Sequence, residues 1–197
     1  MKIYDISQEV FSSVVFPGDP PPKKKTLLNI KNGDVCNLTE LSMCAHNGTH
    51  IDAPYHFCEN GKTVEQISLE RLVGYAYVIK HNGDVTEDDA KEFIKKAKNA
   101  HPDAYKRILI GGNATITYEA SVALANEGIY LVGNESQTVG PEDAPMAVHK
   151  ALLEKEVVLL EGIRLENIPE GVYILSTAPL LLGGIDGAPC RAILIKL

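Results

Sequence analysis

Long apolar runs are absent from this sequence. No stretch approaches the roughly 18 to 20 consecutive apolar residues that a membrane-spanning helix needs, so we expect no membrane segment. The first residues include an early aspartate and lack the apolar core of a signal peptide. Tryptophan is missing, and no internal repeat is visible.

Cysteine and positive charge are also scarce. The four cysteines show no C-x-x-C spacing, and four in a chain of 197 residues hardly make a disulfide scaffold. We therefore expect a reduced, cytoplasmic protein. Nineteen basic against 26 acidic side chains give a formal charge of −7, which does not indicate a basic surface for binding nucleic acid or an anionic membrane. The short basic run Lys23-Lys24-Lys25 follows three prolines and is expected to be a solvated loop.

The length suits one domain, residues 1–197, with a core of ordinary size. Thr86 predicts the start of a helix, because three acidic residues fill the following turn and lysines fill the last. Around it, strands and helices alternate, which predicts an α/β domain with some parallel pairing. We expect strands at 2–7, 75–80, 107–112, 129–133, 157–160, 172–176 and 191–196, and helices at 86–98, 117–127 and 145–155. The outer segments are rich in strands, so a mixed sheet flanked by helices is the expected architecture.

Three of the six histidines and one aspartate lie within eleven residues, at His46, His50, Asp52 and His56. All four occupy even positions, so in an extended chain their side chains would point to the same face. A helix would also align the first two, but Gly48 and the β-branched residues beside it argue against a helix. In a straight strand His46 and His50 would lie about 13 Å apart, too far to share one ion.

The Asn47-Gly48 pair offers a solution, because it is a strong turn signal and tolerates positive φ. A turn there would fold His46 back towards His50 and Asp52. The result is a compact cluster of two nitrogens and one oxygen suited to zinc or manganese. The alternative is a polar loop whose histidines only satisfy backbone groups.

Two later residues are weaker candidates. His149 lies in a helical apolar pattern, where a structural histidine is the default and a cleft-facing one is the alternative. Glu161 directly follows the apolar strand 157–160 and precedes Gly162. A carboxylate at the end of a buried strand is costly unless it is paired or bound to metal, and sites gather at strand ends in α/β sheets.

The twelve residues from His46 to Phe57 resemble the H-x-G-T-H-x-D-x-P-x-H-F signature of the cyclase family of metal-dependent hydrolases, which includes bacterial kynurenine formamidases. The resemblance also covers Asp5-Ile6-Ser7, Pro17-Gly18-Asp19 and the segment 184–191, so it spans nearly the whole chain. It implies the swivelling β/β/α architecture of that family. The formamidases commonly have tryptophan before the Pro-Gly-Asp turn, where this chain has Phe16, so the resemblance indicates the reaction class more strongly than the substrate.

The resemblance implies a two-metal site. His149 and Glu161 match a later histidine and glutamate of the family, twelve residues apart and followed by glycine. One ion would then be held by His46, His50 and Asp52 and the other by Asp52, His149 and Glu161, with Asp52 as the bridge. We expect zinc, one or two ions per site, with manganese as the alternative. Phe16 is the candidate for substrate binding. The alternative is that its buried side chain only stabilises the turn.

The implied activity is hydrolysis of a C–N amide bond. Metal-activated water would attack N-formyl-L-kynurenine, giving L-kynurenine and formate in tryptophan catabolism. His56, at the end of the cluster, is the candidate general acid/base, because imidazole titrates near neutral pH. The alternatives are a cyclic amide, as in isatin hydrolysis, and a non-catalytic metal- or ligand-binding member of the family. The resemblance also implies a homodimer or higher homo-oligomer. The expected ligand is a small-molecule amide substrate.

Overall fold

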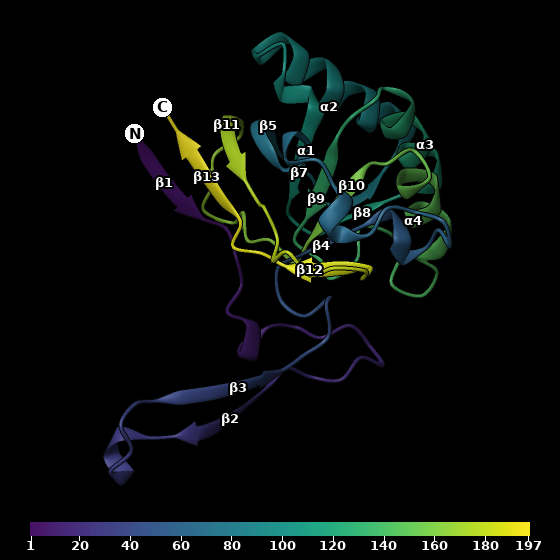
Figure 1. Ribbon diagram of the computed structural model, residues 1–197. Helices are drawn as coiled ribbons and strands as arrows, with labels where there is room; N and C mark the ends of the chain where they lie inside the picture. Colours follow the sequence, from purple (N-terminus) through teal and green to yellow (C-terminus); the bar gives the residue numbers. More distant parts are fainter.

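The computed structural model describes residues 1–197, and one mixed sheet organises them. Its nine strands follow the order β1-β13-β11-β5-β7-β9-β10-β4-β12 (Figure 1). The central strands are parallel: β5 (Val73–Lys80), β7 (Arg107–Gly111), β9 (Leu131–Asn134) and β10 (Val158–Glu161). Antiparallel strands flank them: β1 (Lys2–Asp5), β11 (Gly171–Ser176) and β13 (Ile193–Lys196) on one side, β4 (His50–Asp52) and β12 (Gly187–Pro189) on the other. The predicted mixed α/β class is confirmed.

Three helices cover one face of the parallel strands (Figure 1): α2 (Glu87–Ala100), α3 (Tyr118–Asn126) and α4 (Met146–Leu153). A fourth, α1 (Leu69–Leu72), leads into β5. The predicted start of α2 is confirmed, because the Thr86 hydroxyl accepts a hydrogen bond from the Asp89 amide and the Asp89 carboxylate accepts one from the Thr86 amide. Apolar side chains of these helices, such as Phe93 and Leu124, pack on Ile108 of β7.

The opposite face of the sheet encloses a second core. Along β7, Ile108 and Ile110 face the helices and Leu109 faces the other way, as the two-residue period of a strand requires. Leu109 packs in a cluster with Leu175 of β11 and Leu194 of β13, so the sheet curls over its own face. The central strands are therefore apolar on both sides, which explains their continuous hydrophobic runs.

A two-stranded arm extends away from this body (Figure 1). It consists of β2 (Lys23–Leu28) and β3 (Leu38–Ser42), paired antiparallel. The prediction of a solvated loop at Lys23-Lys24-Lys25 is wrong, because these residues pair with 40–42 of β3. The charged side chains are exposed, as predicted, but the backbone hydrogen bonds come from a distant segment that the local composition does not reveal.

A second small sheet was also not predicted: β6 (Gly83–Val85) pairs in parallel with β8 (Ala114–Ile116). No helix of the protein combines the length and the apolar character needed to cross a membrane.

Candidate metal centre

The short strand β4 positions the centre of the site. His50 and Asp52 are two residues apart in this strand and therefore project from the same face. Both are almost fully buried, because β4 lies between β10 and β12. The preceding turn contains Gly48 with a φ of 73°, and the Asn47 side chain accepts a hydrogen bond from the Cys44 amide at 2.9 Å. This turn brings His46 Nδ1 to 2.8 Å from Asp52 Oδ1. The Asn-Gly pair thus folds His46 back as the sequence predicts.

His56 reaches the site by a different route from the expected strand alternation. The strand ends at Asp52, and the residues Pro54–His56 form a 3-10 helix. The His56 ring lies against the His46 ring, with centroids 4.1 Å apart, and its Nδ1 lies 3.1 Å from Asp186 Oδ2. The four even-numbered residues therefore converge through a turn and a helix rather than through one extended strand.

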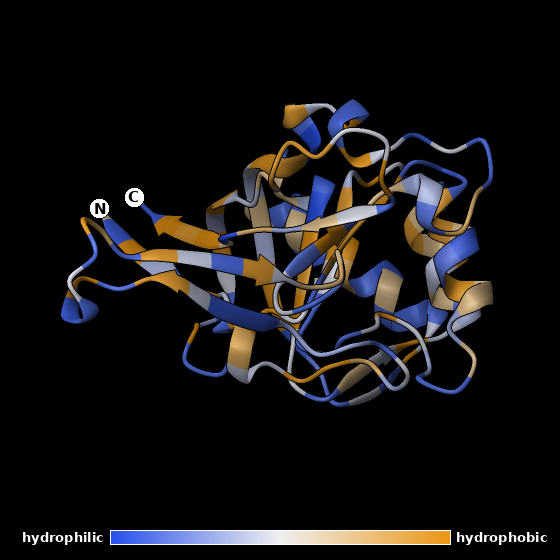
Figure 2. Cartoon of the chain, turned by 60° about the horizontal axis from the view of Figure 1, so that its bottom comes forward, coloured by the Kyte–Doolittle hydropathy of each residue, from blue (hydrophilic) through white to orange (hydrophobic).

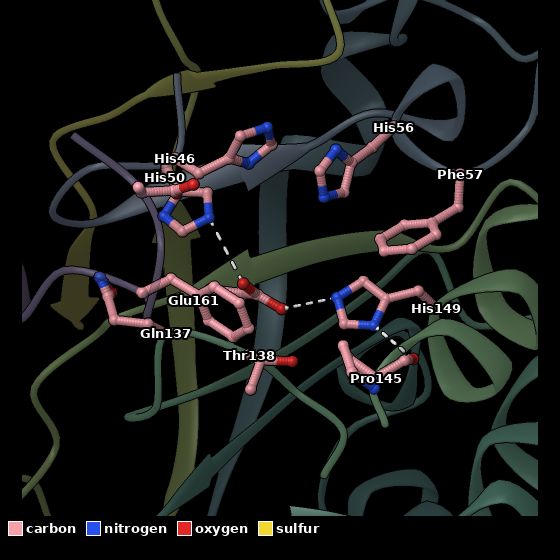
Figure 3. A pocket seen from close by; sticks show the side chains of 11 residues that line it. His46, His50, His56, Phe57, Gln137, Thr138, Pro145, His149 and Glu161 are labelled. Atoms are coloured by element: carbon pink, nitrogen blue, oxygen red, sulfur yellow. Dashed lines mark hydrogen bonds and ion pairs between the residues drawn. The ribbon is translucent and has the colours of Figure 1, made fainter. Parts of the chain in front are cut away.

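His149 and Glu161 come from α4 and the end of β10 (Figure 3). His149 Nε2 lies 3.2 Å from Glu161 Oε1 and 3.6 Å from Asp52 Oδ2. The other oxygen of Glu161 lies 3.4 Å from His50 Nε2. The structure thus brings together residues that are more than one hundred positions apart in the chain.

Backbone carbonyls orient two of the histidines. His50 Nδ1 donates to the Gly48 carbonyl at 3.1 Å, and His149 Nδ1 donates to the Pro145 carbonyl at 2.9 Å (Figure 3). With one proton held at Nδ1, the neutral form of each ring, which is the form that binds metal, points its Nε2 lone pair at the carboxylates. Metal-binding histidines are oriented in this way by their second nitrogen.

The residues present fit a divalent metal. His50 Nε2 and Asp52 Oδ2 are buried without any hydrogen-bond partner, which is costly unless a cation satisfies them. Two groups of candidate ligands meet at the buried centre, one of His46, His50 and Asp52 and one of Asp52, His149 and Glu161, and the ligand atoms of each lie within 4.8 Å of one another. Asp52 belongs to both, with Oδ1 towards His46 and His50 and Oδ2 towards His149.

The electrostatics of the cluster also favour a cation. Burial lowers the pKa of His46 and His50, but the carboxylates of Asp52, Asp186 and Glu161 outweigh it and raise these pKa values to about 11 and about 9. Burial raises the pKa of Asp52, but the two histidines hold it well below its usual value. Without metal, the carboxylates are therefore compensated by protons on the histidines.

Metal binding is consequently expected to release protons. A pH of 7.5 lies below the pKa values of His46 and His50, about 11 and about 9, so both rings carry a second proton, which a ligating nitrogen cannot keep. Titration calorimetry of the metal-free protein with zinc, in buffers of different ionisation enthalpy, should show release of at least about one proton. An enthalpy independent of the buffer would contradict this prediction.

A cavity of about 220 Å³ opens above the cluster, and Phe16 and His56 line it together with the ligand histidines. The structure thus places Phe16 at the pocket, where the sequence nominated it. Sequence reasoning missed other residues of the lining: Asp19, Phe57, Gln137, Thr138 and Pro145. It also missed Asp186, which lies 140 positions from His46 and gives no spacing signal.

A tight glycine turn directly follows Glu161. Gly162 has a φ of 69°, and a Cβ there would lie 2.2 Å from Gln8 Nε2, 2.3 Å from Gln137 Oε1 and 2.6 Å from the Gly48 carbonyl oxygen. Gly128 has a similar φ of 70° but open space around it.

Gly162→Ala is therefore expected to cost about 2 to 4 kcal/mol of unfolding free energy, combining backbone strain with overpacking. Gly128→Ala, the matched control, carries the strain alone and should cost about 1 kcal/mol. Denaturant unfolding of the metal-free proteins measures both values. Equal losses of unfolding free energy in the two variants would show that the neighbours of Gly162 move aside at no energetic cost.

The comparisons with known proteins agree with this geometry. The sequence model of a family described as "Putative cyclase" matches residues 4–141, more than half of the chain. The chain belongs to the cyclase family. Among curated relatives, a kynurenine formamidase of Bacillus mycoides (strain KBAB4) is 32% identical over 206 residues, covering 96% of this chain and 95% of the relative. A kynurenine formamidase of Salinibacter ruber (strain DSM 13855 / M31) is 32% identical over 209 residues, covering 98% and 97%.

Solved structures of cyclase-family type share the fold. A potential metal-dependent hydrolase with cyclase activity superposes with a TM-score of 0.82 at 28% identity, covering 98% of this chain and 96% of the other. Isatin hydrolase A from Labrenzia aggregata superposes with a TM-score of 0.81 at 19% identity, covering 100% and 94%, which shows the fold alone. The predicted family is confirmed, and this cyclase-family protein is an enzyme of the amidohydrolase class.

Proposed function

We propose that this enzyme hydrolyses N-formyl-L-kynurenine to L-kynurenine and formate, using zinc held by the buried cluster. The observation that carries the proposal is the set of three histidines and two carboxylates beside a pocket, with an unpartnered nitrogen and oxygen among them. The 32% identity to kynurenine formamidases over nearly the whole chain supports the choice of substrate.

Each residue has a role in this proposal. His46, His50 and Asp52 hold one ion, and Asp52, His149 and Glu161 hold a second. A bound divalent ion lowers the pKa of a water molecule and polarises the amide carbonyl. His56, which is more exposed than the ligands, gives a proton to the leaving nitrogen.

The lining of the pocket supports an aryl substrate. Phe16 and Phe57 both line the cavity, and the Phe57 ring contacts those of His56 and His149 at centroid distances of 4.5 and 4.8 Å. Aromatic faces of this kind suit a substrate ring, because aromatic pairs gain energy beyond the area that they bury. Phe16 is accordingly assigned to substrate binding.

A cyclic amide such as isatin is the second candidate. The cavity of about 220 Å³ is smaller than most small-molecule sites, which commonly measure about 300 to 1,000 Å³. A compact bicyclic lactam needs less room than an amino acid with an aryl side chain. The same cluster serves either substrate.

Turnover by the purified, metal-stripped protein tests the proposal. Zinc or manganese is restored, and N-formyl-L-kynurenine and isatin are offered separately. Hydrolysis of the formamide that returns with zinc supports the proposal. Recovery with manganese but not with zinc would keep the proposed reaction and replace zinc by manganese as the metal. Opening of isatin without formamide turnover selects the cyclic amide. Bound metal without hydrolysis of either would leave a non-catalytic binding protein.

The proposal includes a cytoplasmic location and a homodimer. All four cysteines are free, which suits a reducing compartment.

The arm of β2 and β3 supplies the surface for dimerisation, because an isolated two-stranded ribbon is marginally stable in water. Its strands are exposed on both faces, and apolar segments run along them (Figure 2). The exposed apolar residues of the arm are Leu27, Ile30, Val35, Leu38 and Leu41.

Charge favours a second copy as the partner of the arm. Residues 23–42 contain four lysines and two acidic residues, whereas the whole chain has a formal charge of −7. The arm is therefore basic and the remaining surface acidic, so an arm of one copy complements the body of another.

Leu41→Glu, at a position 59% exposed, is expected to convert the dimer to a monomer. Light scattering after size-exclusion chromatography measures the mass. Leu69→Glu, at a position 65% exposed on α1, is the matched control and should stay dimeric. A monomeric wild-type protein, or a dimer that survives Leu41→Glu, would exclude the arm as the interface.

A further inference from the structure

A single carboxylate oxygen joins the two outer histidines of the site. Asp186 Oδ2 lies 2.7 Å from His46 Nε2 and 3.1 Å from His56 Nδ1. These are the only side-chain hydrogen bonds of Asp186, and its side chain is 39% exposed. The carboxylate therefore hydrogen-bonds to no side chain outside the site.

The backbone holds Asp186 firmly against the histidines. The Ala53 amide, directly after Asp52, donates to the Asp186 carbonyl at 2.9 Å, and the Val64 amide donates to the carbonyl of Ile185 at 3.0 Å. Gly187 then begins β12, and a Cβ at that position would lie 2.8 Å from His46 Cε1. The glycine permits the close approach that puts the carboxylate within reach of both rings.

The two contacts act on different steps. With Nε2–H donated to Asp186, the neutral form of His46 that binds metal has its lone pair on Nδ1, which faces Asp52 and the first group of ligands. A carboxylate behind a ligating histidine fixes its tautomer and ring orientation. With Nδ1–H donated to the same oxygen, His56 keeps Nε2 free to exchange a proton, as an orienting carboxylate does for a catalytic histidine.

We infer that Asp186 is a positioning residue that orients the metal ligand His46 and the proton-transfer residue His56 together. The effect of Asp186 on His46 concerns metal affinity, which can be measured without a substrate. The effect of Asp186 on His56 concerns proton transfer, and this part of the inference rests on the proposed function. One side chain, distant in sequence from the histidine signature, thereby couples metal binding to proton transfer.

Asp186→Ala tests both contacts, and Asp143→Ala, at an exposed aspartate with no hydrogen bond, is the matched control. Zinc affinity of the metal-free proteins, measured by competition with a chromogenic chelator, should fall about 10- to 100-fold in Asp186→Ala and stay unchanged in the control. With zinc saturating, kcat should fall at least about tenfold with a smaller change in KM, and Asp186→Glu should recover part of both losses.

Wild-type zinc affinity together with wild-type kcat in Asp186→Ala would overturn the inference. If Asp186→Ala fails to fold, as judged by circular dichroism, Asp186→Asn keeps the shape without the charge and is held to the same two measurements. If the wild-type protein hydrolyses no amide, the proposed function fails, but the zinc affinity still decides the role of Asp186 towards His46.

Discussion

Asp52→Asn is expected to reduce zinc binding and to lower kcat/KM for any amide substrate by at least about 10³-fold, because several kcal/mol of metal-derived stabilisation would be lost. Asp52 is the residue shared by the two buried groups of candidate ligands, the group with His46 and His50 and the group with His149 and Glu161. Its two oxygens face His46 and His50 on one side and His149 on the other. A neutral amide presents one oxygen and one NH₂ group, so one of these sides would lose its acceptor.

Elemental analysis after dialysis and a turnover assay measure the two effects of this substitution. Asp103→Asn is the matched control, because the side chain of Asp103 is 51% exposed and forms its ion pair with Lys106 on the surface. A variant at Asp52 that retains the full zinc content and the full rate would remove the carboxylate from the proposed centre.

His56→Ala is expected to lower kcat by about 10²- to 10⁴-fold while zinc content stays at the wild-type level. His56 contacts Asp186 but makes no ion pair with Asp52 or Glu161. Its loss should therefore remove proton transfer to the leaving nitrogen and leave the buried ligands in place. Single-turnover rates and elemental analysis on the same preparation measure the two quantities.

The outcome separates two roles for His56. His46, His56 and Asp186 also lie close enough to hold an ion among themselves. Loss of zinc together with activity would make His56 a ligand and would contradict its role as the general acid/base. His81→Ala is the matched control, because His81 lies outside the pocket, where its ring hydrogen-bonds to the Asp84 carbonyl and packs on Phe93.

Much of the fold was predictable because its signals are local. The N-cap at Thr86, the acidic first turn of α2 and the apolar strands β7 and β10 depend on residues within one or two turns of one another. The arm was missed for the opposite reason. Lys23-Lys24-Lys25 become a strand only through pairing with residues 40–42, and their own composition predicts a loop.

The same distinction applies to the site. His46, His50 and Asp52 lie within seven positions, so a turn at Asn47-Gly48 suffices to join them, and the sequence by itself determined this group. It also determined the family, through a motif of twelve consecutive residues and matches along most of the chain.

The tertiary structure alone decided how the remaining residues meet. Antiparallel pairing of β4 with β10 and β12 brings Glu161 and Asp186 to the histidines from more than one hundred residues away. Likewise, α4 delivers His149 from the helical layer. Neither spacing nor composition encodes such a meeting, because it depends on which strands become neighbours in the sheet, and burial of both faces of that sheet selects those neighbours.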